Sequence, residues 1–156
     1  ITDLNMKEAV QDILSLIARH ENLRKISLRL ELDETIPPVA GDRIQIQQVI
    51  LNLILNSTEA LMSRKQPSRS ILVRTFQPDS RTVTLSVKDN GPGIKENVMP
   101  HLFEAFYTTK EEGLGMGLSI SRSIVEEHGG RLWAENNPDG GATFSFTIPI
   151  AREDLA

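Results

Sequence analysis

The amino-acid sequence predicts an α+β two-layer sandwich, in which a mixed, mainly antiparallel sheet is covered on one face by three helices. Three stretches, residues 6–23, 42–63 and 115–127, place apolar side chains at helical spacing. Two further stretches, residues 69–88 and 131–148, each hold two strand-like runs joined by a turn, which is typical of β-hairpins. A chain of 156 residues is long enough to bury one core.

The first helix is expected over residues 6–23, where Asn5 followed by Glu8 resembles a capping box. Apolar and polar side chains then alternate over residues 26–32, which indicates a strand with one buried face. The proline pair at 37–38 ends that run.

The second helix is expected over residues 42–63. Asp42 is a favourable N-cap, and Gln45 stands three residues later, as in a capping box. Both hairpins follow this helix, with turns at residues 78–80 and 137–141, where Pro, Asp and Gly gather.

A segment of a different kind separates the hairpins. Residues 89–114 contain several Gly and Pro residues and show little periodicity. A connection of this length is usually functional or mobile. Helical spacing returns over residues 115–127, and His128-Gly129-Gly130 predicts a glycine C-cap with a histidine cation in the last turn.

Composition narrows the functional classes. The formal net charge of -4 argues against a nucleic-acid partner, which requires a basic surface. No apolar run approaches the ~20 residues of a membrane helix, so we expect no membrane contact by this domain. Without cysteine there is no thiolate metal site, and His20, His101 and His128 lack the spacing of metal ligands. Residues 1–150 are expected to form one domain and residues 151–156 a tail or linker.

The sequence Asp89-Asn90-Gly91-Pro92-Gly93 follows directly on a predicted strand. A carboxylate there can accept a hydrogen bond from an exocyclic amine such as that of adenine. Gly91 and Gly93 would let a flat ring approach the backbone with no Cβ in the way. The alternative is an ordinary Asp-Asn-Gly turn that binds nothing.

A second glycine cluster, Gly113-Leu114-Gly115-Met116-Gly117, precedes the third helical pattern. The free N–H groups at the start of a helix bind phosphate readily. The spacing matches neither the dinucleotide-binding fingerprint nor a Walker loop, because no Gly-Lys-Ser/Thr follows. A flexible hinge is the alternative.

Asn52 and Asn56 stand four residues apart, on one face of the second predicted helix and among leucines. Amides beside a core cost stability unless they are hydrogen-bonded. An amide oxygen is also a hard, neutral ligand of the kind that Mg²⁺ accepts beside water and phosphate. We therefore expect Asn56 to bind the metal and Asn52 to organise the phosphates and metal-bound waters. Two solvent-facing asparagines are the alternative.

In this order, the motifs resemble the ATP-binding catalytic domain of bacterial sensor histidine kinases, from about residue 42 to residue 149. The boxes of that family have counterparts here: the N box at residues 52–56, G1 at 89–93, the F box at Phe103 and Phe106, G2 at 113–117 and the last box at 141–143. Residues 106–110, with their short connection to G2, are similar to the nitrogen-regulation and oxygen-sensing branch.

The resemblance implies the open sandwich called the Bergerat fold, with ATP under a lid that spans the F box to G2. It implies that the chain binds Mg-ATP and transfers the γ-phosphoryl group to a histidine on a separate helical dimerisation and phosphoacceptor domain. A response-regulator receiver domain is the indirect partner. The expected location is cytoplasmic, whether or not the parent protein is anchored in a membrane.

The motifs and the resemblance together name the expected site. Asn52 and Lys110 are expected to act in catalysis, and Asn56 to hold the metal. The expected cofactor-binding residues are Asn52, Asn56, Asp89, Gly91, Gly93, Ile94, Phe106, Thr109, Lys110, Gly113, Leu114, Gly115, Met116, Gly117, Leu118 and Thr143. In the family, the threonine of the last box, here Thr143, usually supports the adenine-binding aspartate.

Two positions refine the expected reaction: Asn52, which differs from related ATPases, and Glu59, which differs from many members of the resembled family. Gyrase, mismatch-repair ATPases, heat-shock chaperone relatives and anti-sigma serine kinases usually carry a glutamate where Asn52 stands. An amide is a poor proton acceptor, so this site should hold ATP for a better nucleophile, such as imidazole. In many family members a lysine stands where this chain has Glu59, so we expect positive charge from Lys110, with a solvated surface lysine as the alternative. An ATP-hydrolysing domain and a purely nucleotide-sensing domain remain the alternative functions.

The phosphorylated histidine is expected outside this chain. His20-Glu21 is similar to the family's acceptor box only superficially, because no proline follows at the expected place. We expect His20 to be a solvated histidine at a helix end, and Phe103 and Phe106 to be core anchors of one lid edge.

Overall fold

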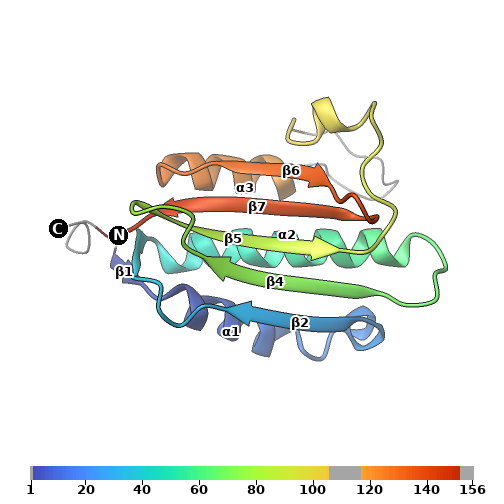
Figure 1. Cartoon of the computed structure of the whole chain (residues 1–156), viewed down its shortest axis with the longest axis horizontal. Coiled ribbons are helices and arrows are strands. Elements are labelled where there is room, and N and C mark those ends of the chain that lie inside the picture. The colour runs from blue at the N-terminus through green and yellow to red at the C-terminus, as the bar shows by residue number, and fades with distance from the viewer. Residues whose placement is uncertain (1, 106–116, 152–156) are drawn as a thin grey trace.

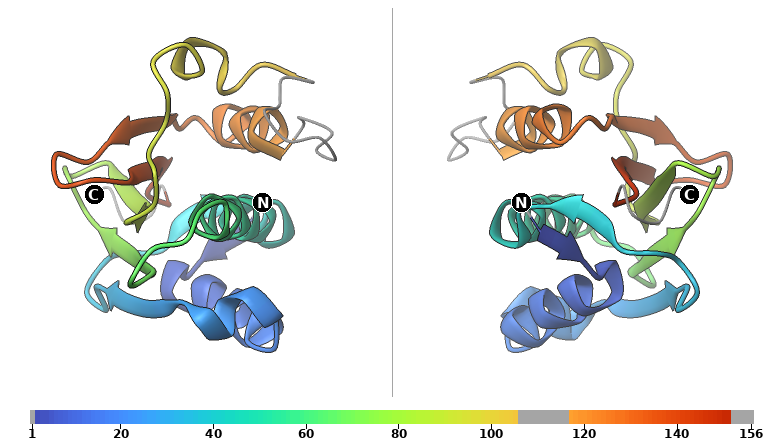
Figure 2. Two further views of the ribbon diagram at one scale, coloured as in Figure 1. Left: turned by 90° about the vertical axis from the view of Figure 1, so that its right-hand side faces the viewer. Right: turned by 90° about the vertical axis from the view of Figure 1, so that its left-hand side faces the viewer.

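The structure is a computed structural model that describes residues 2–105 and 117–151. Within these residues the main sheet has five strands, and its helices pack against one face, as predicted (Figure 1, Figure 2). The elements in chain order are β1 (Thr2–Leu4), α1 (Met6–Ile17), the 3₁₀ helix η1 (Glu21–Lys25), β2 (Ser27–Leu32), β3 (Val39–Gly41), α2 (Arg43–Met62), β4 (Ser70–Phe76), β5 (Thr82–Asp89), the 3₁₀ helix η2 (Met99–His101), α3 (Gly117–Glu127), β6 (Leu132–Asn136) and β7 (Ala142–Pro149).

The main sheet has the strand order β2-β4-β5-β7-β6. Strand β2 runs parallel to β4, whereas the other neighbours are antiparallel, so the predicted mixed, mainly antiparallel sheet is confirmed. The two predicted hairpins are β4–β5 and β6–β7. Because β5 and β7 pair in the middle of the sheet, the end of β5 and the start of β7 lie next to each other.

Helix α2 occupies the centre of the helix layer, between α1 and α3 (Figure 2). It begins after Asp42, whose side chain accepts a hydrogen bond from the N–H of Gln45 at 3.0 Å, and it ends at Met62. The predicted helix is therefore confirmed at both ends. Its apolar side chains are buried against the sheet and the neighbouring helices, namely Ile46, Val49, Ile50, Leu53, Ile54 and Leu61.

The first helix is shorter than predicted. Helix α1 ends at Ile17, and the backbone of His20 is extended. The imidazole of His20 then accepts a hydrogen bond from the N–H of Asn22 at 3.3 Å and caps a separate 3₁₀ turn, which buries Leu23. A side-chain cap competes with the backbone hydrogen bonds that would continue a helix, and this explains the early end.

Two strand features also differ from the expectation. Leu30 in the middle of β2 is 43% exposed, so the predicted buried face is incomplete, because β2 lies at the edge of the sheet. The pairing of β1 with β3, which aligns Leu4 with Val39, was not predicted, since strands of three residues carry too little periodicity.

The last described residue, Ala151, is packed into the fold. Ala151 is buried, and its N–H donates a hydrogen bond to the carbonyl oxygen of Pro38 at 3.0 Å. In the described part of the chain, no helix combines the length and the apolar character that crossing a membrane requires.

His128 is the clearest correction. Gly129 has a φ of 82°, as a glycine C-cap requires, but the imidazole beside it is not a free cation. Its Nδ1 lies 2.8 Å from the carbonyl oxygen of Ile124 and must donate, whereas its Nε2 accepts from the N–H of Asp42 at 3.1 Å. One donor and one acceptor define a neutral imidazole. His128 therefore joins the end of α3 to the start of α2.

Candidate nucleotide-binding site

Three parts of the fold approach one another around the second half of α2. The end of β5, the start of β7 and the start of α3 lie toward the same end of the molecule (Figure 1). A Cβ built on Gly91 would lie 3.4 Å from Cδ2 of Leu61 on α2, and Asn52 on α2 is hydrogen-bonded to the first turn of α3. The Asp89 turn and the start of α3 therefore both lie against α2, the helix that carries Asn52 and Asn56.

Asp89 is the last residue of β5 and is only 3% exposed. Its Oδ1 accepts hydrogen bonds from the N–H groups of Gly91 at 2.9 Å and Ala142 at 3.3 Å. Burial raises the pKa of the Asp89 carboxyl, and the two N–H groups together with the nearby hydroxyl of Ser57 oppose that rise. Within the described residues no hydrogen bond reaches Oδ2, so this oxygen is left to accept from a ligand.

Ser57 is a candidate site residue that the sequence did not indicate. It lies on α2 one position after Asn56 and is 0% exposed. Although its hydroxyl lies close enough to influence Asp89, Oγ makes no hydrogen bond of ordinary geometry. A buried hydroxyl without a partner, beside a buried carboxylate, fits a ligand edge that offers both a donor and an acceptor, and the adenine edge is such a group.

The backbone of Asp89 is held from the β6–β7 turn. Nδ2 of Asn137 donates to the carbonyl oxygen of Asp89 at 3.0 Å, and the hydroxyl of Thr143 donates to Oδ1 of Asn137 at 2.5 Å. Thr143 thus reaches Asp89 through Asn137, with no hydrogen bond to the carboxylate. Gly141 has a φ of 84°, and a Cβ there would lie 2.0 Å from the carbonyl oxygen of Asp89, so only glycine fits.

The glycines of the aspartate turn have an internal role. Gly93 has a φ of 80°, and a Cβ there would lie 2.9 Å from Oδ1 of Asn136. The Asn136 amide accepts from the N–H of Ile94 at 2.7 Å and donates to its carbonyl oxygen at 2.9 Å. A Cβ on Gly91 would lie 3.1 Å from Oδ1 of Asp89 itself. These contacts explain both glycines without a bound ring, and the role predicted for them in clearing space for adenine stays a prediction.

The two amides on α2 have different surroundings. Nδ2 of Asn52 lies 3.1 Å from Oγ of Ser121 and 3.4 Å from the carbonyl oxygen of Gly117, so Asn52 connects α2 to α3. Asn56 is half-buried and makes no hydrogen bond within the described residues. Asn52 is therefore not simply solvated, whereas the amide of Asn56 is open to water or to a ligand.

A metal at this site would have few protein ligands. Among residues 2–105 and 117–151, no group of three His, Cys, Asp or Glu side chains could hold a metal ion. The free oxygen of Asn56 fits a magnesium ion that takes its other ligands from phosphates and water.

Several predicted site residues lie outside the described residues, namely Phe106, Thr109, Lys110, Gly113, Leu114, Gly115 and Met116. Of their neighbours, Gly117 is exposed at the start of α3, and Leu118 packs partly against the core. Phe103 also packs against the core, which confirms the anchoring role predicted for it.

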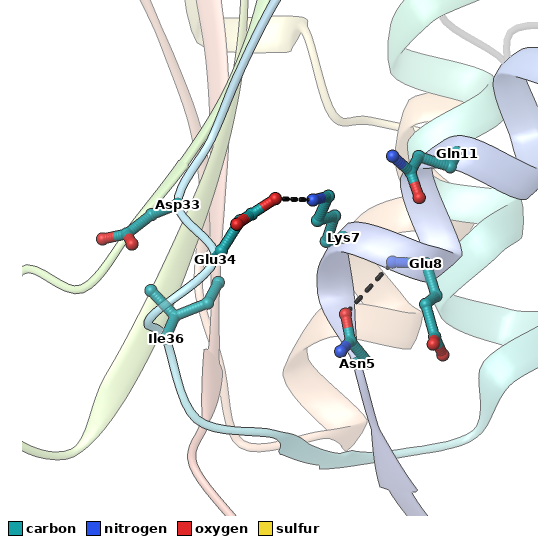
Figure 3. A pocket seen from close by; sticks show the side chains of 7 residues that line it. All are labelled: Asn5, Lys7, Glu8, Gln11, Asp33, Glu34 and Ile36. Carbon is teal, nitrogen blue, oxygen red and sulfur yellow. Dashed lines mark hydrogen bonds and ion pairs between the residues drawn. The ribbon is translucent and has the colours of Figure 1, made fainter.

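A hollow of about 320 Å³ lies elsewhere, between α1 and the connection from β2 to β3 (Figure 3). It is lined by Asn5, Lys7, Glu8, Gln11, Asp33, Glu34 and Ile36. Two of its charged groups already have partners within this chain. Lys7 pairs with Glu34, and Asp33 accepts hydrogen bonds from Thr35. None of these residues belongs to the motifs, so this hollow is not the candidate site.

Comparisons with known proteins identify the family of the chain. The family of histidine kinase-, DNA gyrase B- and HSP90-like ATPases matches residues 41–152, which is more than half of the chain, so the chain belongs to that family. Sensor protein FixL from Bradyrhizobium diazoefficiens is 47% identical over 137 residues, which cover 88% of this chain and 26% of FixL. Sensor histidine kinase TmoS from Ectopseudomonas mendocina is 39% identical over 149 residues, 95% of this chain and 15% of TmoS.

Solved structures define the type of domain. The catalytic domain of histidine kinase ThkA has a TM-score of 0.84 and 34% identity, covering 98% of this chain and 97% of that chain. A complex of ThkA with the response regulator protein TrrA has a TM-score of 0.80 and 32% identity, covering 97% of this chain and 42% of that chain. The chain therefore has the Bergerat fold and is a catalytic domain of the histidine kinase type, spanning about a quarter of the length of FixL.

Proposed function

We propose that this chain binds Mg-ATP between α2, the Asp89 turn and the start of α3, and that it donates the γ-phosphoryl group to a histidine on a separate dimerisation domain. The observation that carries the proposal is the proximity of two buried polar side chains, the Asp89 carboxyl at the end of β5 and the Ser57 hydroxyl on α2. Asp89 is 3% exposed and Ser57 is 0% exposed, and a buried carboxylate beside a hydroxyl that makes no hydrogen bond of ordinary geometry is costly to keep without a ligand.

The adenine end of the proposed site rests on donor and acceptor chemistry. Oδ2 of Asp89 accepts from the exocyclic amine of adenine, while the neighbouring Ser57 hydroxyl serves a ring nitrogen directly or through water. Oδ1 is already saturated by Gly91 and Ala142, which keeps the carboxylate from rotating. The turn thus orients the nucleotide rather than reacting with it.

The phosphate end rests on the amides and on α3. In this proposal Asn56 ligates Mg²⁺, and Asn52 accepts hydrogen bonds from metal-bound water. Magnesium, when bound, neutralises the developing charge on the transferred phosphoryl group. Lys110 is proposed as the protein's own cation at this end, and the glycine loop that ends at Gly117 as the source of N–H groups for the phosphates.

The proposed reaction type follows from the chemistry of the two amides on α2. Asn52 and Asn56 cannot take a proton from water, because an amide is not a general base at neutral pH. Imidazole needs little activation as a nucleophile, so a histidine brought to the γ-phosphate can react where water does not. We propose that this histidine, and any base that assists it, belong to the dimerisation domain of the parent protein.

The parent protein is proposed to act in two-component signalling in the cytoplasm. ThkA, which matches 97% of this chain over 42% of its own chain, has been solved in complex with a response regulator protein. By analogy, a receiver domain is proposed to take the phosphoryl group from the acceptor histidine.

One experiment separates this function from its alternatives. The chain is mixed with a separately produced dimerisation domain, Mg²⁺ and ATP labelled at the γ-phosphate. Acid-labile phosphate on a histidine of the added domain is the expected product. Rapid release of free phosphate would instead support an ATP-hydrolysing domain, and retention of intact ATP a nucleotide-sensing one.

A further inference from the structure

A hydrogen bond between α2 and α3 connects Asn52, at the proposed metal site, to Ser121. The Asn52 amide reaches from α2 to α3, where Oγ of Ser121 lies 3.1 Å from Nδ2. Ser121 is 0% exposed. Its side chain is sealed between the helices, so any influence on a bound nucleotide has to pass through Asn52.

The carbonyl group of Gly117 determines which end of the Asn52 amide faces α3. A carbonyl oxygen only accepts, so the amide nitrogen must point toward it. The second N–H bond of the same nitrogen is directed at Ser121. Both donors of Asn52 are therefore used on α3, and Oδ1 is directed away from these partners. No hydrogen bond reaches Oδ1 from residues 2–105 or 117–151.

The two contacts differ in strength. The contact to Gly117 is 3.4 Å long, beyond the usual range for an N–H···O bond, whereas the contact to Ser121 at 3.1 Å lies within it. The Gly117 carbonyl therefore sets which end of the amide faces α3, and the shorter bond to Ser121 holds the amide there. Without Ser121, only the long contact to Gly117 restrains the carboxamide, which can then rotate and exchange its oxygen for its nitrogen.

This orientation determines what Asn52 can recognise. An amide oxygen accepts from the hydrogens of metal-bound water or binds the metal itself, whereas an amide nitrogen donates to a phosphate oxygen. Asn56 lies one turn further along the same face and is also free to offer an oxygen. Two oxygens on one face favour a hydrated cation.

We propose that Ser121 is a positioning residue that makes nucleotide binding depend on Mg²⁺, because its hydroxyl holds Asn52 with the oxygen toward the metal. This role rests on the proposed function. It predicts that Ser121 affects the gain in affinity that Mg²⁺ confers, and leaves metal-free nucleotide binding unchanged.

The test compares Ser121→Ala with the wild type by titrating a fluorescent ATP analogue in Mg²⁺ and in EDTA. Loss of an outer partner of a direct metal ligand typically costs about tenfold or more, and Asn52 is proposed to act through metal-bound water, so the Mg²⁺-dependent gain in affinity should fall by a smaller factor, about threefold. Affinity in EDTA should not change. Ser121→Cys should fall between the two, since a thiol is a weak acceptor. Ser123→Ala, an exposed serine of the same helix, is the matched control and should behave as the wild type.

A double mutant shows whether Ser121 acts through Asn52. In the background of Asn52→Ala, adding Ser121→Ala should cause no further loss of the Mg²⁺ effect. An additional loss there, or equal weakening with and without Mg²⁺, would overturn the positioning role. A wild type that binds the analogue without any Mg²⁺ effect would instead overturn the metal part of the proposed function, and this role with it.

Discussion

The two ends of the proposed site are built differently. At the Asp89 turn (residues 89–94), the contacts of Asp89 and Ile94 are supplied from the start of β7, the end of β6 and the β6–β7 turn. On the amide face of α2, which consists of Asn52 and Asn56, Asn52 is bonded through its nitrogen only, and Asn56 has no hydrogen bond within the described residues. One end is held by its own contacts and leaves only Oδ2 of Asp89 and the Ser57 hydroxyl open, whereas the other has two amide oxygens to offer.

This difference indicates that adenine recognition and the response to Mg²⁺ belong to separate ends of the site. The Asp89 turn is held in place before any ligand arrives, so adenine recognition costs little ordering. The amide face needs the metal and the phosphates to complete it, so it responds to which nucleotide is bound. Changes at the Asp89 turn should therefore affect both the free energy of unfolding and nucleotide affinity. Changes on the amide face should affect only the Mg²⁺ dependence of nucleotide binding.

The largest expected effect comes from Gly141→Ala at the Asp89 turn. The added Cβ would lie 2.0 Å from the carbonyl oxygen of Asp89, at a residue whose φ is 84°. We expect a loss of about 3 kcal/mol in the free energy of unfolding, measured by urea titration. Gly140→Ala is the matched control, because its φ of 105° is also positive but its Cβ would meet nothing within 4 Å. Equal losses from both variants would contradict the close approach of the two segments.

Asp89→Asn should separate binding from stability. An Asn side chain keeps the oxygen that Gly91 and Ala142 bond, but it offers an N–H to the adenine amine in place of an acceptor. We expect nucleotide affinity to fall by about 10- to 100-fold, measured with a fluorescent ATP analogue. An unchanged affinity would remove Asp89 from the adenine site.

The same variant has a defined pH dependence. Burial raises the pKa of the Asp89 carboxyl in the folded chain, so the ionised carboxylate destabilises the fold as the pH rises through that pKa. Asp89→Asn should therefore unfold at a higher temperature than the wild type at neutral pH. This advantage should shrink as the pH falls through the raised pKa of Asp89 and should be gone below the usual carboxyl pKa, where both side chains are neutral. Melting curves across this pH range measure it.

Asn56→Ala tests the amide face. It removes no hydrogen bond within the described residues, so the free energy of unfolding should change little. The gain in nucleotide affinity on adding Mg²⁺ should fall by about tenfold, while affinity in EDTA stays the same. Weaker binding in EDTA as well would show that Asn56 contacts the nucleotide itself.

The smallest expected effect comes from His128, which joins the end of α3 to the start of α2. His128→Ala loses two hydrogen bonds, to Ile124 and Asp42, and should cost about 1 kcal/mol in the free energy of unfolding. Nucleotide affinity should not change, because the start of α3 keeps its contact with Asn52. His20→Ala, which loses a single bond to Asn22, should cost less. A large loss of affinity in His128→Ala would show that the two ends of α3 are coupled.

Local signals in the chain predicted most of the architecture. The cap at Asp42 and the apolar spacing of α2 are contained within about twenty residues, and both hairpins are marked by their own turns. The same locality explains the errors. The cap at His20 interrupts a pattern that is otherwise helical, and the neutral state of His128 depends on Asp42, 86 residues away.

The order of the motifs also predicted Asp89, Asn52 and Asn56 as site residues, because the chemistry of a carboxylate or an amide can be recognised from the sequence alone. The residues that contact them could not be predicted from the motifs. Ser57 and Ser121 are ordinary helix serines until the sheet and the neighbouring helix bury them. Asn136 is an ordinary strand end and Asn137 an ordinary turn residue until they close against Ile94 and Asp89.

Short-range periodicity, caps and side-chain identity were enough to predict the two later helices, the hairpins and the types of chemical group at the site. The orientation of these groups, in contrast, depends on the folded chain. The hydrogen bond from Asn52 to Ser121 joins positions 69 apart, and the bond from Asn137 to Asp89 joins positions 48 apart. Such contacts exist only after the chain has closed on itself, because burial and hydrogen-bond direction are properties of the packed molecule rather than of any local segment.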